Sequence, residues 1–192
     1  MSASAEDLRD LGPLGHLVGT WVGDKGDDVA PAEPDATVVA KSKYREEMTF
    51  APTGRVDNHE QILYGLRYKT TAWRIGEKEP FHEELGFWMW DKADKQIMRC
   101  FMIPRGVTVL AGGTADELST EFELTAECGS ETYGICSNKF LDREFKTVRY
   151  ELKFTFNEDG SFHYAEDTVL KIRNQEELFH HTDSNTMRRA DG

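Results

Sequence analysis

Hydrophobic and polar residues alternate along most of this chain with a period of two. Tyr44, Met48 and Phe50 fall on one face of an early stretch, and the stretch from Ile62 to Tyr68 alternates in the same way. This period is typical of β-strands that bury one face. It predicts strands over residues 37–50, 61–73, 87–90, 97–103, 107–112, 122–126, 147–156, 162–172 and 178–189, with a turn at 51–54.

The N-terminal part departs from this alternation. Leu8, Leu11, Leu14 and Leu17 lie three residues apart, close to helical spacing, but glycine and proline interrupt them. The segment is therefore expected to form only a short helical turn that caps another part of the fold. Residues 24–35 hold five acids against one lysine among prolines and glycines, which predicts a mobile acidic surface loop.

These elements favour an all-β fold in which about ten strands follow one another in an antiparallel meander. A sheet of that size must close or split into two layers, because exposed strand edges aggregate. Aromatic residues are spread evenly along the strands, as a continuous lining requires. We therefore expect a single domain over residues 1–192, with one closed barrel over about 14–189. Such a barrel can hold one small ligand.

Composition narrows the classes of partner. The 192 residues include 23 Lys and Arg against 35 Asp and Glu, a formal net charge of −12, and both halves of the chain are acidic. This balance disfavours nucleic acids and anionic membranes. The chain also has no apolar run near the ~20 residues of a membrane helix, and no secretory signal pattern at its start.

Cysteine usage indicates a reducing compartment. Cys100, Cys128 and Cys136 are an odd set without C-x-x-C spacing, so neither a disulfide framework nor a structural zinc site is expected. We therefore expect a cytoplasmic protein with free thiols.

Short motifs then appear in a characteristic order. Gly19-x-Trp21 opens the barrel region, in a pattern similar to that of the lipocalin and fatty-acid-binding proteins. It is followed by Tyr44-x-Glu46-Glu47, Leu66-x-Tyr68 with Trp73, Pro80-Phe81-His82-x-Glu84-x-Gly86-Phe87, and a last strand with His180-His181 and Arg188. In this order and spacing they resemble the nitrobindin-like haem-binding β-barrel family, over about Leu14 to Arg189.

The resemblance implies a ferric b-type haem at the barrel mouth with a proximal histidine from the last strand. That histidine corresponds to His180 or His181. Strand alternation favours His181, which shares the apolar face with Phe179 and Met187 and lies seven residues before the arginine. His82 corresponds to the distal histidine, with Phe81 in the place of a methionine. Trp21 and Met187 complete the residues expected to contact the cofactor.

The family also binds nitric oxide, and peroxynitrite isomerisation is assigned to some members. For this chain the resemblance implies these activities as expectations, and no residue is assigned a catalytic role. One departure concerns the glycine motif, which runs after Gly26 into the acidic stretch, whose carboxylates would repel haem propionates.

Two other functions stay open. The barrel could carry an apolar or fatty-acid-like molecule without haem, because alternation points Arg99 inward, where it needs a ligand carboxylate or an acid such as Glu46 as its partner. Alternatively, an acid–base enzyme could use Tyr44, Glu46, Glu84 and Asp167. The oligomeric state, including a homodimer, is also left open.

Overall fold

The structure, a computed structural model, describes residues 5–190, with side chains from residue 8 onward; the ends of the expected domain, 1–4 and 191–192, lie outside this part. Within it are the helices α1 (Ala5–Asp10), η1 (Gly12–Leu17, a 3-10 helix) and α2 (Lys139–Glu144). The strands are β1 (Gly19–Pro31), β2 (Val39–Asn58), β3 (Gln61–Arg74), β4 (His82–Asp91), β5 (Gln96–Ile103), β6 (Val107–Thr114), β7 (Glu121–Cys128), β8 (Gly134–Ser137), β9 (Phe145–Phe156), β10 (Phe162–Ile172) and β11 (Phe179–Arg189).

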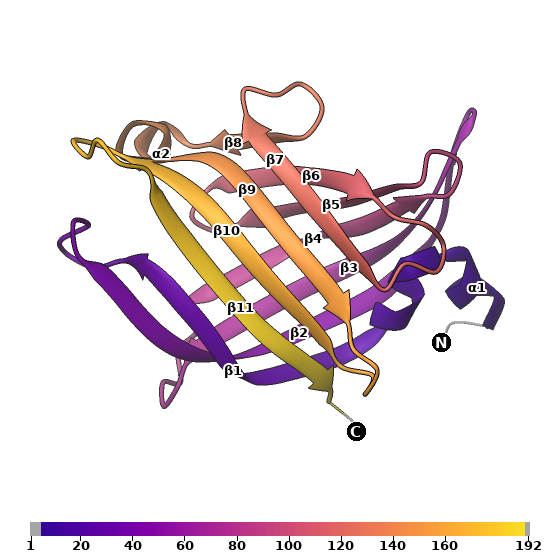
Figure 1. The fold of residues 1–192 in the computed structure, drawn as a ribbon. Helices are drawn as coiled ribbons and strands as arrows, with labels where there is room; N and C mark the ends of the chain where they lie inside the picture. The colour runs from indigo at the N-terminus through magenta and orange to yellow at the C-terminus, as the bar shows by residue number, and fades with distance from the viewer. Residues whose placement is uncertain (1–4, 191–192) are drawn as a thin grey trace.

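These strands close into a barrel in the order β1-β11-β10-β9-β7-β8-β6-β5-β4-β3-β2, and β2 pairs with β1 to complete the ring (Figure 1). Neighbouring strands are antiparallel except β7 and β8, which run parallel. The expected closed barrel is confirmed. The ranges expected from alternation omit two of these strands. β8 has only four residues, too few to show a period, and most of β1 falls in the stretch that was expected to be an acidic loop.

The expectation of an acidic surface loop over residues 24–35 is wrong for most of that range. β1 continues to Pro31 and pairs with β2 on one side and with β11 on the other. A register shift between Gly23 and Gly26 inserts one extra residue into β1 relative to β2. After this bulge the acids alternate like other strand residues, with Asp27 exposed and Asp28 buried.

The turn expected at 51–54 is also absent, because β2 continues through these residues to Asn58. Pairing of β2 with β1 ends at Phe50. Pro52 lies beyond this point, so its missing backbone N–H breaks no hydrogen bond between β1 and β2. The chain instead reverses at His59, whose φ is 57°.

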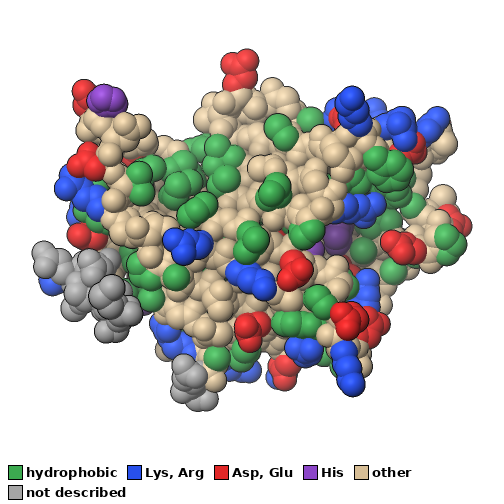
Figure 2. Space-filling model, turned by 180° about the vertical axis from the view of Figure 1, so that it is seen from behind, with side chains coloured by type: hydrophobic (Ala, Val, Ile, Leu, Met, Phe, Trp, Pro, Cys, Tyr) green, Lys and Arg blue, Asp and Glu red, His purple; other side chains and the backbone are tan. Residues whose placement is uncertain are grey.

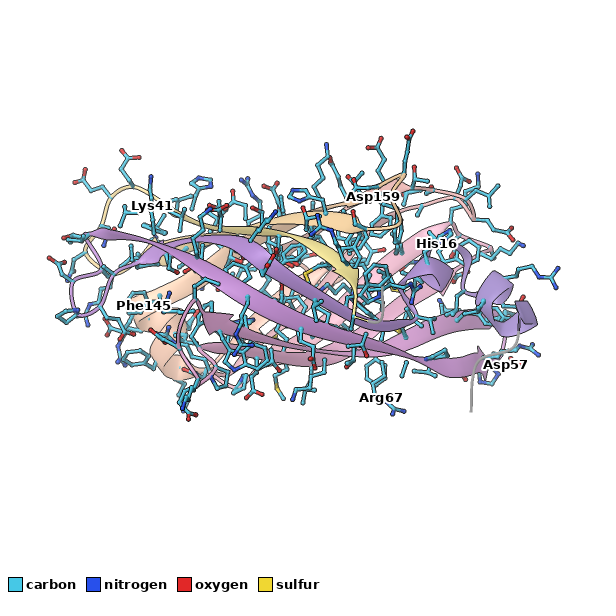
Figure 3. The ribbon with its side chains drawn as sticks, turned by 90° about the horizontal axis from the view of Figure 1, so that it is seen from below. His16, Lys41, Asp57, Arg67, Phe145 and Asp159 are labelled. Carbon is cyan, nitrogen blue, oxygen red and sulfur yellow. The ribbon has the colours of Figure 1, made fainter. Side chains whose placement is uncertain are left out.

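The N-terminal segment closes one end of the barrel, as its leucine spacing predicts. Leu14 and Leu17 of η1 are fully buried, and Trp21 Nε1 donates a hydrogen bond to the Leu17 carbonyl at 2.7 Å. We call this end the floor. Figure 1 shows η1 and α1 there, and in Figure 3 the labelled His16 and Asp159 lie at the same end.

Aromatic side chains fill the barrel above the floor. Phe154 lies 4.7 Å from Phe162 and 5.1 Å from Phe122 between ring centroids, and Trp88 packs edge-on against Phe154. A cavity beside Trp88 and Phe154, which Arg99 and Glu166 also line, has a volume of only about 10 Å³, about that of one water-sized sphere. This cavity is far too small for a ligand of the size of haem or a fatty acid.

Candidate functional site

The opposite end of the barrel, which we call the mouth, carries the histidines that the sequence singled out. It is framed by the β1–β2, β3–β4 and β10–β11 connections at the left of Figure 1, and the labelled Lys41 and Phe145 mark the same end in Figure 3. His181 near the start of β11 and His82 at the start of β4 both lie at this end.

His181 faces the inside of the mouth, as strand alternation predicts. Its Nε2 lies 3.0 Å from Oδ1 of Asp28, and its side chain is 35% exposed against 5% for Asp28. The same carboxylate accepts a hydrogen bond from Ser42 Oγ at 3.0 Å and lies 3.7 Å from Arg74 Nη1. Burial raises the pKa of Asp28, but these contacts outweigh burial and hold its pKa below the usual value. Since an ionised carboxylate only accepts, Nε2 of His181 carries a proton in this contact.

His180 points the other way, to the outer surface. It is exposed, and its Nδ1 lies 2.6 Å from Oδ2 of Asp167, which is on the outer face of β10. The structure therefore separates the two histidines by face, and it places Asp167 away from the interior acids.

His82 belongs to a buried network of charges centred on Arg99. His82 Nε2 lies 3.1 Å from Glu84 Oε1, and Glu84 Oε2 accepts from Arg99 Nη2 at 2.6 Å. Arg99 also bonds Glu166 and Tyr150, and it donates to Tyr68 Oη at 3.1 Å. Burial lowers the pKa of His82, but the hydrogen bond and charge of Glu84 raise it above its usual value overall.

This network contains the acidic partners of Arg99, which was expected to pair with a ligand carboxylate or an acid such as Glu46. Arg99 is 3% exposed, and its salt-bridge partners are Glu84 and Glu166 rather than Glu46. A guanidinium that already holds two carboxylates is not free to bind the carboxylate of a ligand.

Glu46 forms a second buried network without any cation. Its Oε2 accepts from Tyr164 Oη at 2.6 Å and from Asn185 Nδ2 at 3.3 Å, and its Oε1 accepts from Thr70 Oγ1 at 2.8 Å. Tyr44 Oη lies 2.8 Å from Tyr164 Oη and extends the chain towards the mouth. Burial raises the pKa of Glu46 to about 7, against the opposing effect of these hydrogen bonds.

A third group of acids crosses the strands beside His181. Asp28, Asp183 and Glu166 are cross-strand neighbours on β1, β11 and β10. Burial, followed by the charges of Glu166 and other interior carboxylates, raises the pKa of Asp183 well above its usual value. The ionised form of Asp183 is therefore disfavoured by its surroundings.

Aromatic and cationic side chains form the rim on the β3–β4 side. Phe81 is 38% exposed, its ring lies 6.0 Å from that of Tyr44, and the guanidinium of Arg74 sits 4.5 Å from its centroid. Arg74 thus links the Asp28 contact to the wall that carries Phe81 and His82.

Trp21 and Met187, which were also expected to contact a cofactor, lie at the floor instead. Trp21 packs on Phe162, whose cross-strand partner is Met187, and both Trp21 and Met187 are buried. His181, His82 and Phe81 therefore lie at the mouth. His180 faces the outer surface at this end, and Trp21 and Met187 lie at the floor.

Asp28, Arg74 and Glu166 were not identified from the sequence. The bulge in β1 hides Asp28, because strict alternation from Trp21 and Gly23 would point the odd-numbered Asp27 inward. Strand alternation alone could have placed Glu166 on the inner face with Tyr164.

The outer surface has two further features. A groove of about 490 Å³ lies on the outer face of β1, β11, β10, β9 and β7, and its acids pair with bases, as in the 3.5 Å contact of Glu123 with Lys153. The opposite outer face, seen in Figure 2, carries exposed apolar side chains, among them Leu85, Phe87 and Met102 on β4 and β5.

Comparison with known proteins supports the closed barrel. No curated protein sequence matches this chain. Among solved structures it is similar to the crystal structure of Rv2717c from M. tuberculosis, with 20% identity, a TM-score of 0.66, and coverage of 97% of this chain and 99% of that one. At this identity the similarity establishes the fold.

The family is shown by a sequence profile. The profile of the THAP4-like, heme-binding beta-barrel domain matches residues 10–189, and this chain belongs to that family. Among the described residues no helix is long and apolar enough to span a membrane.

Proposed function

We propose that this chain binds a b-type haem at the mouth of the barrel, with His181 as the protein ligand of the iron. The observation that carries the proposal is the inward, half-buried imidazole of His181 at the open end of a barrel whose family binds haem. The b-type is part of the proposal and rests on the resemblance to the nitrobindin-like family.

The residues at the mouth include the types of side chain that bind haem. Among residues 8–190 no group of three or more His, Cys, Asp or Glu side chains is placed to hold a metal ion alone, but haem iron needs only one axial protein ligand. Phe81 offers exposed aromatic surface, and Arg74 at the rim offers a cation for a propionate. An iron bond at Nε2 of His181 must replace the contact of this nitrogen with Asp28.

The chain's own residues then have separate roles. His181 supplies the imidazole nitrogen, and Glu84 holds the ring of His82 in place through a hydrogen bond at Nε2. Bound haem would supply an iron that can coordinate a diatomic ligand such as nitric oxide. Nitric oxide binding and peroxynitrite isomerisation are the activities we propose to test once binding is established.

Hemin titration followed by the Soret absorption tests the proposal. We expect His181→Ala to weaken hemin binding at least 100-fold, because it removes the axial bond, and His180→Ala to have no effect, because His180 lies outside. Retention of the Soret band and affinity in His181→Ala would contradict the proposed ligand. A wild-type chain that binds no hemin would overturn the function.

The fatty-acid carrier is less well supported by the structure. The cavity beside Arg99 inside the barrel has a volume of only about 10 Å³, and Arg99 is already paired with two carboxylates. A fluorescent fatty-acid analogue that binds the haem-free chain with micromolar affinity would favour this alternative.

A further inference from the structure

We propose that Asp28 is an internal competitor for the iron-binding nitrogen of His181, so that haem uptake requires the Asp28–His181 contact to be exchanged for an iron bond. This inference rests on the proposed function and adds a residue that sets the affinity of the same site.

The competition follows from the position of one atom. Oδ1 of Asp28 lies 3.0 Å from Nε2 of His181, in the region that an iron bonded to Nε2 would enter. The carboxylate needs Nε2 to carry a proton, whereas a metal needs the bare lone pair of the same nitrogen. The two contacts are therefore mutually exclusive, and on exchange a neutral imidazole must carry its proton at Nδ1.

Asp28 is held firmly enough to compete. It is 5% exposed and accepts a hydrogen bond from Ser42 Oγ at 3.0 Å. Arg74 donates to the same hydroxyl at 2.5 Å and stacks on Phe81, so Asp28, Ser42 and Arg74 support one another across β1, β2 and β3. The position of the carboxylate is thus built into the barrel wall.

An opposite role for Asp28 can be separated from this one. Carboxylates often hold the second nitrogen of a metal-bound histidine and strengthen its bond to the metal. That arrangement would require the iron to bind Nδ1 of His181, since Nε2 is taken by Asp28. The two roles predict opposite effects when Asp28 is removed: tighter haem binding for a competitor and weaker binding for a supporting partner.

The neighbouring residue offers a matched control. Asp27 precedes Asp28 in β1, but its side chain is 59% exposed and pairs with Lys43 on the outer surface. Removing either acid changes the net charge of the chain equally. A specific effect of Asp28 is therefore separable from a general effect of charge.

The experiment compares hemin affinity in wild type, Asp28→Ala, Asp28→Asn and Asp27→Ala. We expect Asp28→Ala to bind hemin about 10- to 100-fold more tightly, the range typical of a lost charged hydrogen bond, and Asp27→Ala to match wild type. Asp28→Asn should fall between, because a neutral amide oxygen accepts more weakly, and it serves as the measured variant if Asp28→Ala does not fold. The gain must vanish when His181 is also replaced by Ala. Unchanged or weaker binding in both Asp28 variants overturns the inference.

Nitrogen-15 NMR of the haem-free chain separates failure of this inference from failure of the proposed function. We expect Nε2 of His181 to be protonated in wild type and to lose this preference in Asp28→Ala. A bare Nε2 in wild type overturns the competition regardless of haem. If wild type binds hemin through His181 but Asp28→Ala gives no gain, the inference alone fails. If neither binds hemin, the proposed function fails and Asp28 is not what limits uptake.

Discussion

Replacing Glu46 by Gln should abolish a large pH dependence of stability. Glu46 is 5% exposed and is surrounded by the uncharged donors Tyr164, Thr70 and Asn185. Burial therefore raises its pKa from 4.5 to about 7 in the folded chain, and the charge of Glu84 acts in the same direction. The glutamine side chain of the variant has the shape of the protonated acid and does not titrate.

The sign and size of the change in unfolding free energy with pH follow from proton linkage. Between pH 4.5 and about 7 the folded chain keeps the Glu46 proton while the unfolded chain releases it, so the folded state binds more protons. The free energy of unfolding must then fall as pH rises through this window. The full difference in pKa corresponds to about 3 kcal/mol. Glu46→Gln should match wild type near pH 4.5 and exceed its stability by about 3 kcal/mol at pH 8.

Urea unfolding followed by tryptophan fluorescence at several pH values measures this difference. Glu47→Gln is the matched control, because Glu47 is the next residue of β2 and is exposed; its curve should follow wild type at every pH. If wild type and Glu46→Gln lose stability with pH at the same rate, Glu46 does not hold a proton in the barrel and the reasoning is refuted.

Two further predictions concern the interior. Arg99→Met leaves Glu84 and Glu166 buried without their cation and should cost about 3–5 kcal/mol, seen as a lower thermal midpoint; a loss below about 1 kcal/mol would contradict the buried network. Trp88→Phe should lower the free energy of unfolding by about 1–2 kcal/mol less than Trp90→Phe does, as measured by urea unfolding. The reason is that Trp88 Nε1 is buried without a hydrogen-bond partner, whereas Trp90 Nε1 donates to the Ala115 carbonyl at 3.2 Å. Equal losses for the two variants would indicate that Trp88 Nε1 is satisfied.

Local patterns in the chain were sufficient for the barrel and for the direction of its histidines. A strand points successive side chains to opposite faces, so alternation alone placed His181 inside and His180 outside, and pointed Arg99 inward. The leucine spacing before Gly19 likewise predicted the segment that closes the floor. These features depend only on residues close together along the chain, so they can be predicted from a single sequence.

Contacts between distant residues were decided by the closed barrel. The bulge after Gly23 turned Asp28 inward, and pairing of β1 with β11 brought it to His181, 153 residues away. Closure also gave Arg99 its partners Glu84 and Glu166 and left Glu46 without a cation. A bulge shifts every later residue of a strand to the other face, and burial changes a pKa only when the surrounding strands are in place. For these reasons the composition of the mouth depends on tertiary structure, although each of its residues is visible in the sequence.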